Sequence, residues 1–221
     1  MKLKKRIKIA IDSPAAAGAG TVAKKICKHY NLLYLDTGKI YRYLAYLKTK
    51  NPKKFNLKFV KKEMKSLSLL KLNKKSLIKD EIGVQASIIA KNRFIRKLVH
   101  DFQVNIAYNQ NKKFNGSCLD GRDITYKIIP DAEFKFFITA NVNVRAERRF
   151  KELKLMKKSL NFKDVLKSIK KRDKNDYNRK ISPLKKTKDS VLINTTNLTK
   201  RSCFLKIKKI IDKELNKHGN L

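Results

Sequence analysis

The stretch IAIDSPAAAGAGTVAKKI, from Ile9 to Ile26, decides the fold of this chain. A β-branched run over 7–11 is typical of a buried strand, and helical spacing follows over 21–30. The small residues between them let backbone N–H groups approach phosphate oxygens, and a helix N-terminus adds positive potential. The stretch therefore predicts a phosphate-binding loop between a strand and a helix.

This loop departs from the usual pattern G-x-x-x-x-G-K-[ST]. Ser13 stands at the first glycine and Ala19 at the lysine, whereas Gly18, Gly20 and Thr21 are kept. Thr21 opens the helix, where a loop hydroxyl holds Mg²⁺. Taken alone, the loop fits a nucleotide site, a dead copy of one, or a plain strand-to-helix turn with glycines for packing.

The rest of the chain alternates short apolar runs with helical patterns. Strands are predicted at 7–11, 32–35, 117–119, 134–139 and 190–194. Helices are predicted at 21–30, 40–47, 80–113 (one long helix or two abutting ones), 144–157, 162–172 and 199–215. The lysine-rich segment 51–79 is expected to be a partly helical insert, and 173–183 a charged loop with helical character. Such alternation indicates an α/β fold with a parallel sheet and helices on both faces.

Length and composition narrow the class of protein. With 221 residues, 42% of them hydrophobic, the chain is long enough for one sizeable core. The apolar run at 7–11 is too short for a signal peptide or a membrane span, so a cytoplasmic protein without a membrane partner is expected. Cys27, Cys118 and Cys203 form no C-x-x-C spacing and are expected to be reduced core residues.

The formal net charge of +38 raises the question of nucleic-acid binding. Lysines run from Lys2 to Lys217 beside many Ile, Asn, Phe and Tyr, a bias that A/T-rich codons produce alone. We therefore expect only weak binding at low salt and no dedicated nucleic-acid partner. Against this lysine background an arginine is informative, because its planar fork grips phosphate or carboxylate with two parallel hydrogen bonds.

Three polar motifs follow predicted strands. They are the loop after Asp12, the turn Asp36-Thr37-Gly38, and Asp120-Gly121-Arg122-Asp123. Each has an ordinary explanation by itself, as a helix cap or a tight turn. Because parallel strands end at one edge of a sheet, where ligands bind, the three together predict a binding site there.

Taken in order, the motifs resemble those of the bacterial cytidylate kinases, in the nucleoside-monophosphate kinase group. The family's IDGPxxxGKGT loop is similar to 11–21, its D-[ST]-G-x-x-Y-R to 36–42, and its DGRD is matched at 120–123. Shorter patterns are matched at Ala86-Ser87 with Arg93 and Arg96, Pro130–Ala132, Arg145–Arg149, Arg172–Leu184 (R-D-x-x-D-x-x-R-x-x-x-P-L) and Ile193–Thr196. The resemblance covers nearly the whole chain and is weakest over 48–79.

The resemblance implies a three-layer fold like that of P-loop NTPases, with a parallel sheet, a short NMP-binding insert and a small lid. It implies a single kinase domain over 1–221. The core would span about 1–47, 114–150 and 184–221, the insert about 48–113, and the lid about 151–183. A monomer is expected.

The implied activity is transfer of the γ-phosphoryl group of ATP, with Mg²⁺, to CMP or dCMP. Arg42 and Arg122 would grip the acceptor phosphate, while Ser87, Arg96 and Arg179 would read cytosine. The whole CMP set is Asp36, Thr37, Arg42, Ser87, Arg96, Arg122, Asp123, Arg172, Asp176 and Arg179, of which Arg122, Asp123, Arg172 and Arg179 would be catalytic. The ATP set is Ser13, Pro14, Ala15, Ala16, Ala17, Gly18, Ala19, Gly20, Thr21 (also the Mg²⁺ ligand) and Arg148.

The departures from the family pattern lie mostly on the ATP side. Ala19 removes the lysine that reaches the β- and γ-phosphates, and 125–127 replaces a usual Gly-Thr pair. The arginines of the CMP side all stand, which favours a working kinase with a substitute cation, either Lys24 or Lys127. Two alternatives stay open: a catalytically impaired CMP-binding pseudokinase, and a basic RNA-binding protein.

Overall fold

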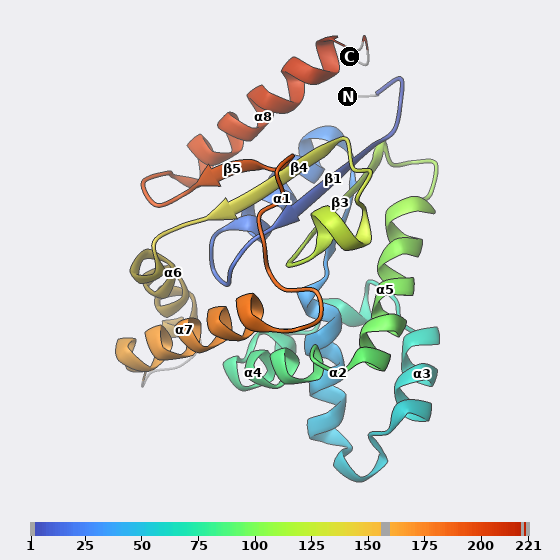
Figure 1. Ribbon diagram of the computed structural model, residues 1–221, viewed down its shortest axis with the longest axis vertical. Helices are drawn as coiled ribbons and strands as arrows, with labels where there is room; N and C mark the ends of the chain where they lie inside the picture. Colours follow the sequence, from blue (N-terminus) through green and yellow to red (C-terminus); the bar gives the residue numbers. More distant parts are fainter. Residues whose placement is uncertain (1–2, 156–159, 218, 220–221) are drawn as a thin grey trace.

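Five parallel strands form one sheet in the computed structural model of the chain, which describes residues 3–155, 160–217 and 219 (Figure 1). They are β1 (Ile7–Asp12), β2 (Leu33–Asp36), β3 (Gly116–Gly121), β4 (Phe134–Thr139) and β5 (Val191–Asn194). Their order is β2-β3-β1-β4-β5, so each connection crosses over through helices. The five predicted strands and the α/β fold class are confirmed, and β3 is longer than predicted.

Helices cover both faces of the sheet, as the sequence predicts. On one face lie α1 (Ala19–Tyr30) and α8 (Lys200–Lys217), against the side of β1 that carries Ile9 and Ile11. On the other face lie α2 (Gly38–Lys50) and α5 (Arg93–Tyr108), against the side that carries Ala10. β1 is packed on both faces, and four of its six residues, Ile7, Ile9, Ala10 and Ile11, are apolar.

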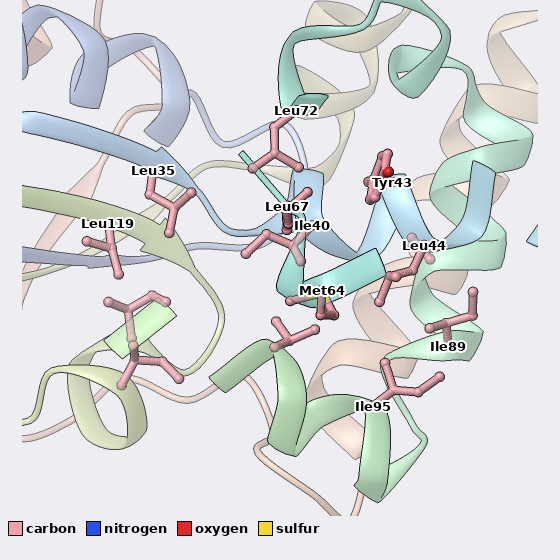
Figure 2. Packing of buried hydrophobic residues seen from close by; sticks show 14 of the residues in the cluster. Leu35, Ile40, Tyr43, Leu44, Met64, Leu67, Leu72, Ile89, Ile95 and Leu119 are labelled. Atoms are coloured by element: carbon pink, nitrogen blue, oxygen red, sulfur yellow. The ribbon is translucent and has the colours of Figure 1, made fainter. Parts of the chain in front are cut away.

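The segment between α2 and α5, which the structure describes in full, consists of helices joined by short turns, without a strand. It contains α3 (Leu57–Lys65), α4 (Asp80–Ile89) and three short 3-10 helices at Pro52–Lys54, Lys71–Asn73 and Lys75–Ile78. Figure 2 shows how side chains of this segment, such as Met64 and Leu72, meet Ile40 of α2 and Leu35 of the sheet in one buried cluster. The region predicted as one long or two abutting helices is therefore two, α4 and α5.

Between β4 and β5 lie α6 (Val142–Lys154) and α7 (Phe162–Asn178), which pack together through Ala146, Val165 and Ile169. The helix predicted at 144–157 has its last two residues outside the described ones. The segment 173–183, predicted as a charged loop with helical character, is regular helix over 173–178, because α7 continues to Asn178. The α7 helix also contacts α4, and both helices lie below the sheet in the view of Figure 1.

Candidate active site

The three strand-end motifs meet at one edge of the sheet. Strand register pairs Asp12 with Gly121, and Asp36 with Asp120. The Thr37 backbone N–H and hydroxyl both donate to the Asp120 carbonyl oxygen, at 3.1 and 2.8 Å. The motifs therefore lie together at this edge, as their positions after parallel strands predict.

The predicted phosphate loop, residues 13–18, makes the turn between β1 and α1. Two of its residues take left-handed backbone angles, Ala16 at φ 59° and Gly18 at φ 91°. Glycine adopts such angles freely, whereas alanine is strained there by about 1–2 kcal/mol. Two side chains hold the loop carbonyls: Arg145 donates to Ala15 O at 3.0 Å, and Thr195 donates to Ala17 O at 2.9 Å.

Asp12, directly before the loop, anchors the segment that follows β3. Its carboxylate accepts from the Ile124 and Thr125 backbone N–H groups at 2.8 and 2.9 Å, and from the Thr125 hydroxyl at 2.6 Å. These bonds fix a single π-helical turn at Ile124–Ile128. Complete burial raises the pKa of Asp12 to about 6, and the bonds from Thr125 partly offset that rise.

Three neighbouring cavities surround the loop. The α8 cavity, about 410 Å³, lies between the loop and α8 and is lined by Thr21, Arg148 and Thr195 among others. The loop cavity lies directly on residues 13–21, and the α4 cavity lies between α2, α4 and α7. Thr21 and Arg149 line both the α8 and the loop cavities, while Arg122 and Arg172 line both the loop and the α4 cavities. The loop cavity therefore joins the other two.

The predicted CMP residues are brought together by the α4 cavity, with one exception. Nine line it: Thr37, Arg42, Ser87, Arg96, Arg122, Asp123, Arg172, Asp176 and Arg179. Asp36 lines the loop cavity instead. All nine predicted loop residues, 13–21, line the loop cavity, and Arg148 lines the α8 cavity.

One end of the α4 cavity is built from buried polar groups. Arg96 and Asp123 form an ion pair with an Nη2–Oδ2 distance of 2.5 Å, and both residues are buried. The Ser87 hydroxyl donates to Val84 O at 2.7 Å, which leaves its oxygen able to accept. Arg179 donates through Nε to Ser182 O at 2.5 Å, but its Nη2 is buried without a hydrogen-bond partner. This donor is available to a ligand that enters the cavity.

The other end of the α4 cavity concentrates arginines. Arg122 donates through Nε to Asp176 at 2.7 Å; burial opposes ionisation of Asp176, but this arginine holds the pKa of the carboxyl below its usual value. Arg172 forms no hydrogen bond with another described residue. Burial and the charges of Arg42 and Arg122 lower its pKa to about 10. This cluster of cations favours an anion between them.

The lack of a side chain at Gly83 gives Arg42 room beside α4. Its Nη1 donates to Leu77 O at 2.7 Å and to Lys79 O at 3.0 Å, across the start of α4. A Cβ added at Gly83 would lie 2.6 Å from Arg42 Nη2, so any side chain at this position would displace the guanidinium. A single glycine inside the predicted helix 80–113 was the sequence signal for this close approach.

Oxygen ligands for a divalent cation lie on the loop cavity. Thr21, Asp36 and Asp120 all line it. Within the described residues, no group of three or more His, Cys, Asp or Glu side chains could hold a metal alone. Thr21, Asp36 and Asp120 together fit Mg²⁺, which is usually held by one or two carboxylates together with water and substrate phosphates.

The two candidate substitutes for the loop lysine fall in different places. Lys24 of α1 lines the loop cavity. Lys127 lines a separate cavity beside α5, with Arg93 and His100, and lies away from the loop because the π-helical turn directs it there. Sequence analysis also missed the part played by Arg145, which links Ala15 O to Asp173 of α7.

The chain is similar to known proteins over almost its whole length. The family profile described as cytidylate kinase matches residues 9–213. A cytidylate kinase of Clostridium tetani is 37% identical over 96% of each chain, and one of Bartonella tribocorum is 41% identical over 95% of this chain and 96% of its own. A crystal structure of an uncharacterized protein from Eubacterium ventriosum covers 94% of this chain and 99% of its own, with a TM-score of 0.51 at 18% identity, which shows the fold alone.

Two general properties complete the description. None of the described helices is long and apolar enough to cross a membrane. All three cysteines are free and buried, as the sequence predicts. With a family profile that spans almost the whole chain and relatives at 35–41% identity, the chain belongs to the cytidylate kinase family.

Proposed function

We propose that this chain is a nucleoside-monophosphate kinase that transfers the γ-phosphoryl group of ATP to CMP or dCMP, giving CDP or dCDP. The observation that carries the proposal is the α4 cavity beside the phosphate loop. Five arginines line this cavity: Arg42, Arg96, Arg122, Arg172 and Arg179. Joining two polyanions requires strong neutralisation in a dry site, and forked arginines provide it with fixed geometry. Phosphoryl transfer needs little covalent help beyond this.

In the acceptor half of the proposal, CMP occupies the α4 cavity. Arg42, Arg122 and Arg172 hold its phosphate, because all three line both the α4 cavity and the loop cavity. Cytosine lies at the far end, beside Arg96 and Asp123. Its carbonyl oxygen O2 and its ring nitrogen N3 accept from arginine, and its amino group donates to a carboxylate or a hydroxyl.

In the donor half, the nucleoside of ATP occupies the α8 cavity and its phosphates lie on the loop. Arg148 borders that cavity and is fixed by donating to Thr195 Oγ1 at 2.9 Å and to Thr195 O at 2.6 Å. Thr21 with Asp36 and Asp120 would hold Mg²⁺. When bound, the cation neutralises charge that develops on the phosphates.

The chain's own residues then position the reactants. Asp176 orients Arg122 through the 2.7 Å hydrogen bond, so the guanidinium faces the transferred group in a set direction. The α7 helix carries Arg172 and Asp176, and its contact with α4 excludes water from the site. We propose that segments 48–113 and 151–183 act as the NMP-binding insert and the lid, which open for exchange.

Both cavities are built from one chain, so the proposed enzyme works as a monomer, in the cytoplasm where its substrates are. The test is a coupled assay with Mg-ATP and each of CMP, dCMP, UMP and AMP. We expect CMP and dCMP to be turned over at least about tenfold more effectively than UMP or AMP, at about 1 s⁻¹ or faster. Arg179→Ala should lower kcat/KM for CMP by about 100-fold, because it removes the buried donor in the cavity.

Two results would refute the proposal. Equal turnover of UMP and CMP would remove the assignment of cytosine recognition. No turnover with any acceptor, together with a CMP-dependent rise in melting temperature, would mean that the chain binds CMP as a catalytically impaired relative. Arg201→Ala, an exposed change on α8, is the matched control and should behave as the wild type.

A further inference from the structure

We propose that Lys24 supplies the cation that contacts the donor phosphates, in place of the lysine that the loop lacks at Ala19. The inference rests on the proposed function, since it concerns how the same site binds a triphosphate. Lys24 is the one lysine lining the loop cavity among the residues that the structure describes. It makes no hydrogen bond or ion pair within the described part of the chain, so its ammonium group can reach a ligand.

Helix geometry directs Lys24 at the loop. Gly20 and Lys24 are four residues apart on α1, so they lie on the same face, about 6 Å apart along the axis. Helical side chains lean toward the N-terminus, so the flexible four-carbon stem of Lys24 extends over Gly20. Gly20 has no side chain to block it.

The neighbours of Gly20 show that this face of α1 borders the loop cavity. A Cβ added at Gly20 would lie 3.2 Å from Tyr34 Oη and 3.3 Å from Asp120 Oδ2. Burial and the neighbouring Asp36 raise the pKa of Asp120 well above its usual value. The positive charge of Lys24 lies close enough to oppose this rise, together with the charge of Arg122. The Lys24 ammonium therefore acts at the place where phosphates and carboxylates meet.

Other cations on the loop cavity are already committed. Arg122 is held by Asp176, and Arg42 by the carbonyls of Leu77 and Lys79. Arg149 donates to Glu152 at 2.8 Å and to Ile78 O at 2.7 Å. Arg172 lies between the loop and α4 cavities, on the acceptor side. Lys24 is left to cover the donor phosphates nearest to α1.

The test compares Lys24→Ala with Lys25→Ala and adds a rescue. Lys25 is exposed on the same helix and lines none of the three cavities, so it is the matched control. Ala19 lines the loop cavity, so Ala19→Lys places an ammonium group in it from the neighbouring turn. Readouts are kcat with Mg-ATP and CMP, and calorimetric affinities for inorganic tripolyphosphate and for CMP.

We expect Lys24→Ala to lower kcat by about 100- to 1000-fold and to weaken tripolyphosphate binding at least about tenfold, with CMP affinity unchanged. Adding Ala19→Lys to that variant should restore most of both losses. Equal behaviour of Lys24→Ala and Lys25→Ala, with an active wild type, would overturn the inference and leave the proposed function standing. A loss that Ala19→Lys does not restore would also overturn it, because Lys24 would then serve only Asp120.

A wild type without turnover would instead overturn the proposed function. The inference would still be supported if tripolyphosphate bound to the wild type and lost affinity only in Lys24→Ala. Failure of both variants to alter tripolyphosphate binding would refute it in that case too.

Discussion

Gly83→Ala should raise the stability of this protein and at the same time lower its kcat/KM for CMP. The added Cβ would lie 2.6 Å from Arg42 Nη2, 3.1 Å from Cζ and 3.2 Å from Nη1. Ordinary contact begins at 3.4 Å, so the guanidinium must shift by about 0.8 Å. The atoms in the way belong to the end of a flexible side chain, so the helix itself need not move.

Two opposite magnitudes follow from that geometry. Replacing glycine by alanine inside α4 reduces the entropy of the unfolded chain and stabilises the protein by about 0.4–1 kcal/mol. The displaced arginine loses its alignment with Leu77 O and Lys79 O, at 2.7 and 3.0 Å. Misplacing a positioning group by about 1 Å can cost about 100-fold, so we expect kcat/KM for CMP to fall by about 10- to 100-fold.

The assay measures kcat and KM for CMP and for ATP, beside urea unfolding. KM for ATP should stay unchanged, because α4 does not line the α8 cavity. Ile88→Ala, on the same helix and 47% exposed, is the control and should leave both KM values unchanged. A Gly83→Ala enzyme with wild-type kcat/KM for CMP would refute the role assigned to Arg42.

Two further predictions concern stability. Asp173→Asn removes the partner of the buried Arg145, whose Nη2 lies 2.6 Å from Asp173 Oδ2, and should lower the free energy of unfolding by about 3 kcal/mol; a urea midpoint like that of the wild type would contradict this. Burial raises the pKa of Asp12 from 3.8 to about 6, so ionisation destabilises the folded state as pH rises through that window. Relative to Asp12→Asn, the wild type should therefore lose about 2 kcal/mol between pH 4 and 6. Parallel pH profiles of unfolding for the two proteins would exclude this.

The sheet and the gathering of the motif residues at its edge were predictable, because local signals agree with the tertiary structure. Short β-branched runs become strands, and polar motifs after them meet because parallel strands share an edge. Arginines stand out from a lysine-rich background where a fork is needed, as with Arg96 on Asp123 and Arg122 on Asp176. The resemblance to a family added the order of these motifs.

Other features depend on contacts that no local pattern contains. The α7 helix runs to Asn178 through a charged stretch without apolar spacing, and it is held by the ion pairs of Asp173 and Asp176 with α6 and β3 neighbours. Lys127 is close to the site in sequence, but the turn that Asp12 fixes carries it to the α5 cavity. The space that Arg42 needs beside Gly83 is a matter of packing across two helices.

The central claim is that a loop without its lysine still transfers a phosphoryl group to CMP. The most direct test incubates the purified protein with Mg²⁺, γ-labelled ATP and CMP, and separates the products by anion exchange. An Arg172→Ala protein purified in the same way controls for contaminating kinases, because Arg172 lies between the loop and α4 cavities. The account predicts labelled CDP in amounts equal to the ADP formed, and far less with Arg172→Ala. ATP left intact, or equal CDP from both proteins, would contradict it.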